Sequence, residues 1–227
     1  MRLVAVIAAY QEAARLSGVL ALVAPHVDRM VVVDDGSTDG TAQAVDHPQA
    51  VLLRHSLNRG QGAALRTGTA AALELGADII VHLDADGQHD PTSIAALVAP
   101  IRAGEADIVF GSRFLGIPAE GMPRARRVLI WGIRQFNRWV LGIPAVVTDP
   151  QTGFRALSAP AARALTFHQD RMAHASEILS RVTRSSWRWR EVPARVVYTE
   201  YSLKKGQKGT DALKVAWKLI LGAFQRS

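Results

Sequence analysis

The sequence predicts an α/β fold, with a mostly parallel central sheet flanked by helices. Two observations predict it. Short apolar runs of strand length alternate with helical patterns through the first half of the chain, and those runs are uniformly apolar or β-branched, as buried parallel strands tend to be. Such alternation places helices on both faces of a parallel sheet. The 227 residues, 48% of them apolar, can form one sizeable core.

The expected elements follow from these runs in chain order. We expect strands at Leu3–Ala8, Met30–Val33, Val51–Leu53, Ile79–Leu83 and Ile108–Phe110. We expect helices at Glu12–Val23, Gly40–Val45, Gly62–Leu75 and Thr92–Ile101. Ala-rich spacing supports the third helix, and Asp90-Pro91 supplies a cap and a first-turn proline for the fourth. We find no internal repeat or low-complexity linker, so residues 1–227 are predicted to form a single domain.

The composition excludes several classes of protein. The chain has no cysteine, which rules out disulfides and thiolate chemistry. The apolar run at Met1–Ala9 is too short for a signal peptide, so we expect none. No run of about 18 apolar residues exists, and we therefore expect no membrane-spanning segment.

Charge divides the chain into two unequal parts. Residues 1–123 contain 8 Lys and Arg against 14 Asp and Glu, a net charge of −6, whereas residues 124–227 contain 19 against 6, a net charge of +13. This pattern fits a solvated basic surface. It also fits a contact with an anionic partner, such as nucleic acid, lipid headgroups or a phosphorylated substrate.

Two basic stretches with aromatic residues lie in the C-terminal half, at Arg126–Val140 and Thr210–Phe224. Both resemble amphipathic helices that lie in a membrane interface. A helix packed on the sheet with its cationic side chains in water has the same pattern, so both interpretations stay open.

The strongest chemical signal is the string Asp84-Ala85-Asp86-Gly87-Gln88-His89-Asp90-Pro91, directly after an apolar strand. Ligands bind at the carboxyl ends of strands in open parallel sheets. Two carboxylates so close together repel unless a cation lies beside them. The oxygen atoms of Asp84, Asp86 and Gln88 suit Mg²⁺ or Mn²⁺. The alternative is a helix-capping turn, but Asp90 already serves that purpose.

Other polar strings also follow strands. Asp34-Asp35-Gly36-Ser37 ends a second buried strand, where an acid can accept hydrogen bonds from a base or ribose. Asn58–Ala64 opens a helix but lacks the Walker lysine and the dinucleotide glycine spacing, so helix capping is the simpler interpretation. Gly111-Ser112-Arg113, Thr148–Arg155 and Glu177 are each, taken alone, more often structural.

Together these motifs resemble family 2 glycosyltransferases, most closely the dolichol-phosphate mannose synthase branch and its bacterial polyprenyl-phosphate relatives. The resemblance runs through nearly the whole chain and includes Ala8–Glu12, Asn58–Gly68 and Glu191-Val192-Pro193 as well as the strings above. It implies the GT-A fold and an inverting glycosyltransferase that uses Mg²⁺ or Mn²⁺.

The resemblance also implies roles for individual residues. The nucleotide-sugar site would comprise Ala8, Tyr10, Glu12, Val33, Asp35, Asp84, Ala85 and Arg113. The metal would be held by Asp84, Asp86 and Gln88, and the catalytic group would be Asp86, Arg113, Asp149 and Glu177. The acceptor phosphate would meet Arg155, Arg195, Lys204 and Lys205.

The sequence departs from the family pattern at several positions. The family usually has Pro and Asn in its first loop, where Ala8 and Gln11 stand here, and often a Lys where Gln61 stands. An Arg expected after Glu-Val-Pro falls at Thr199, so Arg195 or Lys204 would have to replace it.

The predicted reaction moves a sugar from a nucleotide-diphosphate sugar to a polyprenyl phosphate. Such an acceptor is already anionic and needs no general base, unlike a hydroxyl. Residues 1–123 would then bind the nucleotide and metal, and residues 124–227 would face the acceptor and membrane. We expect a cytoplasmic protein bound peripherally to the cytoplasmic face of the membrane, with a small integral-membrane protein as one conceivable partner.

Competing functions remain at this stage. One is transfer to a saccharide hydroxyl in cell-surface polysaccharide synthesis, and another is an inactive scaffold that binds nucleotide sugars. Nucleic-acid binding is not expected, because Trp187-Arg188-Trp189-Arg190 is too short for a recognition module. A nicotinamide-dependent dehydrogenase should carry a glycine fingerprint where Ala8-Ala9-Tyr10-Gln11 stands.

Overall fold

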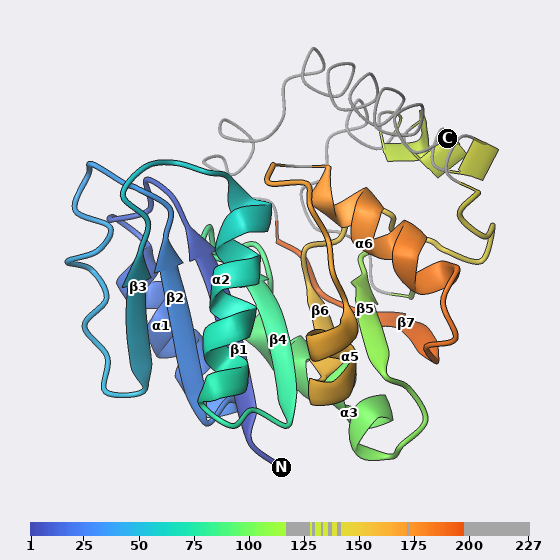
Figure 1. Ribbon diagram of the computed structural model, residues 1–227, viewed down its shortest axis with the longest axis horizontal. Helices are drawn as coiled ribbons and strands as arrows, with labels where there is room; N and C mark the ends of the chain where they lie inside the picture. The colour runs from blue at the N-terminus through green and yellow to red at the C-terminus, as the bar shows by residue number, and fades with distance from the viewer. Residues whose placement is uncertain are drawn as a thin grey trace.

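The computed structural model describes residues 1–116, 142–171 and 173–197, together with 128, 130–132, 134–135 and 138–139. Seven strands form one sheet in the order β3-β2-β1-β4-β6-β5-β7 (Figure 1). Their bounds are β1 Leu3–Ala9, β2 Arg29–Asp34, β3 Ala50–Arg54, β4 Ile79–Asp84, β5 Ile108–Ser112, β6 Arg155–Ser158 and β7 Trp189–Pro193. Only β6 runs antiparallel to its neighbours, β4 and β5. The carboxyl ends of the other six strands therefore meet at one edge of the sheet.

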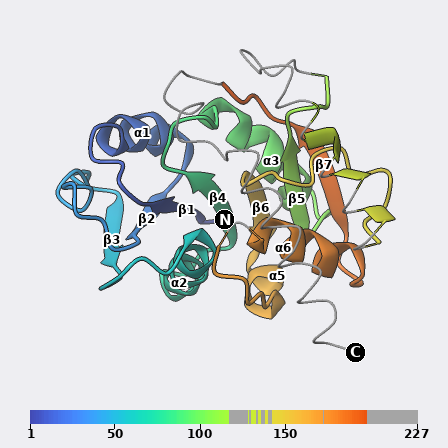
Figure 2. The same ribbon diagram turned by 90° about the horizontal axis from the view of Figure 1, so that it is seen from above.

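Helices cover both faces of the sheet, as Figure 2 shows from above. The helices are α1 Leu16–Val23, α2 Gln61–Glu74, α3 Ile94–Arg102, α5 Ala159–Ala164 and α6 His174–Thr183, with 3₁₀ turns at Ala24–His26 and Pro91–Ser93. Helices α1 and α3 pack on one face, and α2, α5 and α6 on the other. In β1, Ala5 and Ile7 point to the first core, and Val4 and Val6 to the second, as the two-residue period of a strand requires.

All five predicted strands are confirmed, and so is the mostly parallel α/β architecture. The helix expected at Glu12–Val23 begins only at Leu16. The helix expected at Gly40–Val45 is wrong, because this segment forms turns. There the Thr41 hydroxyl donates to Asp39 Oδ1 at 2.6 Å and accepts from the Glu12 amide at 2.8 Å, contacts that fix a loop.

The C-terminal predictions have mixed outcomes. Residues 128, 130–132, 134–135 and 138–139 are helical, in agreement with the helix expected at Arg126–Val140. The helix expected at Thr210–Phe224 lies outside the described residues. Within the described ranges, no helix is both long and apolar enough to cross a membrane.

Candidate active site

Several of the predicted site residues lie at the carboxyl edge of the sheet. Strand β2 ends at Asp34, β4 ends at Asp84, and Arg113 directly follows β5. The loop 148–154, which precedes the antiparallel strand β6, returns to the same edge. Polar groups from four neighbouring parts of the chain thus surround one region, as expected for a ligand site in an open α/β sheet.

The loop after β4 carries the acidic pair. Asp86 Oδ1 accepts a hydrogen bond from the Gln88 amide at 3.0 Å, and Asp86 Oδ2 accepts from Gln88 Nε2 at 2.7 Å. Asp84 Oδ1 accepts from Gln61 Nε2, the first residue of α2, at 2.5 Å. Gly87 allows the tight turn that follows Asp86 because its φ is +74°. Gln88 therefore orients Asp86, and Gln61 orients Asp84.

The two carboxyl groups are held in an environment that favours their neutral forms. Burial raises the pKa of Asp84, and Arg155 and Arg113 oppose that rise. Burial also raises the pKa of Asp86, and the neighbouring Asp84 raises it further. A divalent cation would relieve both the desolvation and the repulsion. The pair therefore fits a divalent ion, the metal predicted from the sequence.

Such an ion would need ligands beyond these side chains. In the described part of the chain, no group of three or more His, Cys, Asp or Glu side chains is arranged to hold a metal. Mg²⁺ typically takes one or two carboxylates and completes its shell with water and substrate phosphates. The donor set of Asp84 and Asp86 fits that mode of binding.

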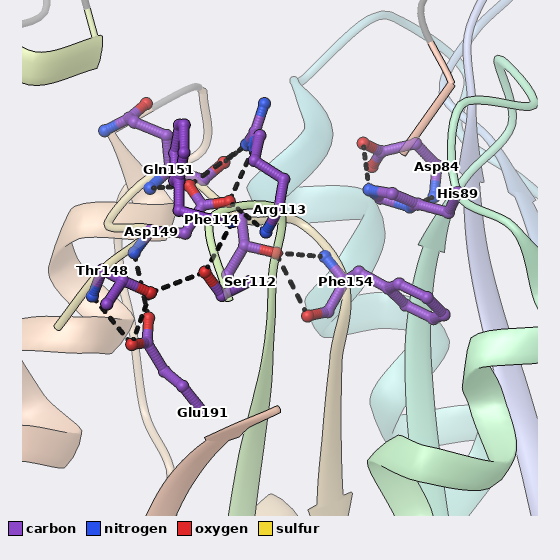
Figure 3. Close-up of polar contacts among 11 residues, drawn as sticks. Asp84, His89, Ser112, Arg113, Phe114, Thr148, Asp149, Gln151, Phe154 and Glu191 are labelled. Atoms are coloured by element: carbon purple, nitrogen blue, oxygen red, sulfur yellow. Dashed lines mark hydrogen bonds and ion pairs between the residues drawn. The ribbon is translucent and has the colours of Figure 1, made fainter. Parts of the chain in front are cut away.

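His89 and the segment after β7 close one side of the acidic loop. The His89 ring stacks on Phe154 with centroids 4.8 Å apart (Figure 3). Burial lowers the pKa of His89 to about 4, so the ring is neutral at pH 7. The Val197 amide donates to the Gln88 carbonyl at 2.9 Å, and the Asp90 amide donates to the Arg195 carbonyl at 3.1 Å. The chain predicted to reach the acceptor phosphate thus leaves β7 alongside the acidic loop.

Asp35, predicted to contact the nucleoside, already accepts several hydrogen bonds from within the protein. Its carboxylate accepts from His55 Nδ1 at 2.6 Å and from the amides of Arg59 and Gly60 at 3.1 and 2.6 Å. These contacts hold the loop before α2. Val33 is buried, with its side chain against Gly68, so only its backbone could meet a nucleoside.

The other predicted nucleotide residues differ in exposure. Tyr10 is 41% exposed and Ala8 is half-buried, whereas Glu12 and Ala85 are buried. Of this group, Tyr10 has the surface area that stacking on a base would require.

Arg113 and Asp149 form a bidentate ion pair at the end of β5. Arg113 Nε donates to Asp149 Oδ2 at 2.6 Å, and Arg113 Nη2 donates to Oδ1 at 3.2 Å. Glu191 in β7 fixes the loop beneath this pair, because its carboxylate accepts from the Thr148 amide and hydroxyl and from the Asp149 amide (Figure 3). Sequence reasoning noted Glu191 only within a motif and missed this anchoring role.

Glu177, predicted to be catalytic, holds a loop in place. Its Oε2 accepts from the amides of His168 and Gln169 at 2.9 and 2.8 Å, and its Oε1 pairs with Arg181 at 3.1 Å. Burial would raise the pKa of Glu177, but these donors outweigh burial and lower it.

The loop that Glu177 holds caps the N-terminus of α2. The Asp170 carbonyl accepts from the Gly62 amide at 2.7 Å. A Cβ at Gly62 would lie 2.1 Å from the Gln169 carbonyl oxygen, so only glycine fits this contact. Glu177 thereby helps to position α2, whose first residue, Gln61, reaches Asp84.

The predicted acceptor-phosphate residues separate into three outcomes. Arg155 has no exposed surface and lies beneath the site, so it cannot contact a lipid phosphate in this conformation. Arg195 is accessible, with 47% of its side chain exposed, and lies 3.6 Å from Asp90 Oδ2. Lys204 and Lys205 lie outside the described residues.

A second surface lies beyond Asp149. A pocket of about 230 Å³ is lined by Trp131, Arg134, Gln135, Arg138, Ile143, Pro144, Ala145, Val147 and Pro150. Large apolar side chains around it are exposed, with Trp131 at 62%, Trp139 at 80% and Val146 at 68%. Exposed tryptophan beside arginine is typical of side chains that meet a membrane interface.

Known proteins resemble this chain along most of its length. The family model described as "Glycosyl transferase family 2" matches residues 4–158. The chain is 33% identical to the UDP-N-acetylglucosamine–dolichyl-phosphate N-acetylglucosaminyltransferase of Methanococcus voltae, over 95% of this chain and 94% of that protein. It is 34% identical to the undecaprenyl-phosphate mannosyltransferase of Micrococcus luteus, over 73% of this chain and 70% of that protein.

A solved structure supports the fold. Glucosyl-3-phosphoglycerate synthase from Mycobacterium tuberculosis, in complex with Mn²⁺, UDP and phosphoglyceric acid, matches with a TM-score of 0.71 and 21% identity over 94% of this chain and 76% of that one. This likeness confirms the predicted GT-A fold. The extent of the family match, and the identity to relatives along most of their length, show that this chain belongs to glycosyltransferase family 2.

Proposed function

We propose that the protein transfers a sugar, with inversion, from a nucleotide-diphosphate sugar to a polyprenyl phosphate. The observation that carries the proposal is the acidic pair Asp84 and Asp86, two half-buried residues at and just after the end of β4, whose carboxyl groups are oriented by Gln61 and Gln88. The names of the Methanococcus voltae and Micrococcus luteus relatives, which specify dolichyl and undecaprenyl phosphate, support the acceptor class.

The side chains divide the work of the reaction between donor and acceptor. Mg²⁺ or Mn²⁺, when bound, would neutralise the charge that grows on the departing diphosphate. Asp84, Asp86 and the side-chain oxygen of Gln88 would hold the ion, and Gln88 Nε2 would orient Asp86. Arg113, fixed by Asp149, would direct a cationic group toward the sugar-phosphate bond. Tyr10 would stack on the base.

The engagement of Asp149 and Glu177 favours a phosphate acceptor over a hydroxyl. A hydroxyl acceptor needs a general base with a free lone pair. Asp149 is bound by Arg113, and Glu177 is bound by two amides and Arg181. A polyprenyl phosphate is anionic at pH 7, so it can attack the anomeric carbon without losing a proton.

The proposed location is peripheral, on the cytoplasmic face of the membrane. Residues 1–123 would bind the donor and metal, and residues 124–227 would face the lipid. The exposed Trp131 and Trp139 beside Arg134 and Arg138 support this orientation. A small integral-membrane protein could supply the anchor.

Transfer assays with matched acceptors test the acceptor class. Purified protein would receive UDP-N-acetylglucosamine, UDP-glucose or GDP-mannose, with a short polyprenyl phosphate, the corresponding polyprenol, or a soluble disaccharide. We expect product with one donor, only with the phosphorylated lipid and only with Mg²⁺ or Mn²⁺. Equal transfer to the disaccharide would instead support polysaccharide synthesis, and nucleotide binding without any transfer would support an inactive scaffold.

A further inference from the structure

Arg155 is a fully buried cation that the reaction described above does not use. It is the first residue of β6 and lies opposite His82 of β4, on the face covered by α2 and α6. Its Nε donates to the Gly153 carbonyl at 3.3 Å, and its Nη2 donates to His174 Nε2 at 3.3 Å. Its Nη1 is buried without any hydrogen-bond partner.

No carboxylate in the described ranges lies within ion-pair distance of Arg155. The histidine that contacts Arg155 supplies no compensating charge either. Burial lowers the pKa of His174 to about 3, so the ring that accepts from Arg155 is neutral. Burial lowers the pKa of Arg155 to about 10, which leaves the guanidinium protonated at pH 7. The guanidinium of Arg155 is therefore the charged member of its contact with His174.

The charge that Arg155 faces belongs to the acidic loop. Asp84 is the one carboxylate whose field acts appreciably on Arg155 among the described residues. The two groups are joined through the backbone of Gly153, where an added Cβ would lie 3.0 Å from Asp84 Oδ2. The cation thus lies beneath the place where the metal and diphosphate of the proposed donor would bind.

An unpaired buried cation is costly unless something binds to offset it. Its field opposes the arrival of a free divalent cation and favours the arrival of a diphosphate. Because the interior screens charge less than water does, both effects persist over several ångströms.

We propose that Arg155 is a positioning residue that makes the site take up a metal ion together with a nucleoside diphosphate in preference to the metal ion alone. This inference rests on the proposed function, because it assumes a metal–diphosphate donor. Arg155 acts through the electric field at the acidic loop and through the Gly153 backbone, without touching substrate.

Separate titrations of ion and nucleotide test this proposal without measuring activity. Mn²⁺ alone, UDP or GDP alone, and each nucleotide with saturating Mn²⁺ would be titrated by calorimetry into wild type and into Arg155→Met, Arg155→Gln and Arg155→Lys. In Arg155→Met we expect Mn²⁺ alone to bind at least as tightly as in wild type, and the nucleotide alone to bind about tenfold more weakly. Arg155→Lys, which keeps the charge, should restore the wild-type pattern.

A matched control and a folding check separate this role from a structural one. Arg163→Met removes an exposed arginine from α5 and should leave all affinities unchanged. If Arg155→Met does not fold, Arg155→Gln against Arg155→Lys provides the same comparison. Mn²⁺ and nucleotide affinities that fall together in the neutral variants, or a Lys variant that resembles Met, would overturn the inference.

The outcome in wild type separates a failure of the role of Arg155 from a failure of the proposed function. Metal-assisted nucleotide binding in wild type with unchanged coupling in the neutral variants would overturn the role of Arg155 and leave the proposed function intact. Absence of metal-assisted binding in wild type would overturn both.

Discussion

Asp84 and Asp86 lie one residue apart, and the fold keeps both in conditions that oppose their ionisation. For a carboxyl whose folded pKa is raised, the folded state binds its proton more tightly than the unfolded state does. Stability is then highest at low pH and is lost as pH rises from the ordinary Asp value of 3.8 through the raised one. The metal-free protein is therefore destabilised at neutral pH by the groups that would bind its metal.

The variant Asp86→Asn tests this conflict directly. It removes the charge, so we expect a higher Tm for the metal-free protein at pH 7 and no further rise on adding Mn²⁺. Transfer should fall by roughly 10²-fold or more, since the charge on the leaving group loses its counter-ion. Differential scanning fluorimetry with and without Mn²⁺, together with initial rates, would measure both effects.

Asp90→Asn is the matched control in the same loop. Asp90 caps the following turn by accepting from the Thr92 amide at 3.0 Å, and Asn caps as well as Asp does. Its Tm and its response to Mn²⁺ should therefore equal those of wild type. A metal response retained by Asp86→Asn would contradict the metal assignment.

Gly153→Ala probes the contact between the loop 148–154 and Asp84. The new methyl would lie 3.0 and 3.1 Å from the two carboxylate oxygens, so Asp84 must move by a few tenths of an ångström. We expect Mn²⁺-assisted nucleotide affinity to fall about tenfold, the weakening that a loss of about 1.4 kcal/mol produces. Gly18→Ala in α1, where a Cβ meets nothing within 4 Å, should leave affinity unchanged and stabilise the protein by up to about 1 kcal/mol. Equal affinities for both variants would exclude a tight contact.

Among the strands, the apolar pattern predicted those that are buried on both faces of the sheet. The uniformly apolar strands β1, β2, β4 and β5 were all predicted, because parallel strands covered by helices have no polar face. Strands β6 and β7 escaped prediction for opposite reasons. β6 has four residues and begins with a charged Arg155, while β7 lies at the sheet edge and reads Trp-Arg-Glu-Val-Pro, half exposed.

The misassigned helix at Gly40–Val45 has a local cause. Its Gly and Thr are compatible with a helix start, but the Thr41 side chain bonds to Asp39 and to the distant Glu12 amide instead. Side-chain bonds of this kind compete with helix formation, and the partner 29 residues away is invisible to a local pattern.

Glu177 holds the loop that caps the N-terminus of α2, so we expect Glu177→Gln to lower the stability of the protein. Loss of the charge weakens two amide bonds and the Arg181 pair, so the free energy of unfolding at pH 7 should fall by about 2 kcal/mol. Because the pKa of Glu177 is lowered, wild type loses this contribution progressively as pH falls from the ordinary Glu value of 4.5 through the lowered one, so the difference between the two proteins should shrink over that range. Urea unfolding at pH 7 and pH 4 would measure the difference.

The same variant decides between a structural and a catalytic role for Glu177. If Glu177 acts only through the loop, kcat should stay within about threefold of wild type at a temperature where both are folded. A loss of kcat of about 10³-fold with unchanged stability would restore the catalytic role predicted from the sequence.

For the molecule as a whole, the sequence predicted where the candidate site lies but not which partners its side chains bind. The motifs placed Asp35, Asp84, Arg113 and Asp149 at one edge of the sheet, and the structure brings them there. The sequence motifs could not indicate that Asp35 binds His55, or that Asp149 binds Arg113 and Glu191. Those partners lie 20 to 42 residues away along the chain. The burial of Arg155 likewise depends on the helices that cover it. The polar motif that contains Arg155 does not indicate that those helices lie there.

Arg134 and Arg138 show where part of the positive charge of the C-terminal half lies in the structure. Both line the pocket next to the exposed Trp131, on the side of the molecule beyond Asp149. A basic residue near an anionic membrane contributes about 1 kcal/mol to binding, so Arg134→Gln plus Arg138→Gln should weaken binding to phosphatidylglycerol vesicles roughly 30-fold. The matched control is Arg102→Gln plus Arg163→Gln, at the ends of α3 and α5 near the amino edge of the sheet.

Vesicle co-sedimentation at increasing salt would separate a specific surface from general attraction. Exposed charges are screened beyond about 10 Å at 0.1 M salt, so the affinity of wild type for anionic vesicles should fall steeply as salt rises. The control pair should follow wild type at every salt concentration, because its arginines would face away from the membrane. Neutral phosphatidylcholine vesicles should bind all three proteins weakly and alike. Equal losses from both arginine pairs would mean that net charge alone draws the protein to lipid, and that the surface around Trp131 has no preferred orientation toward it.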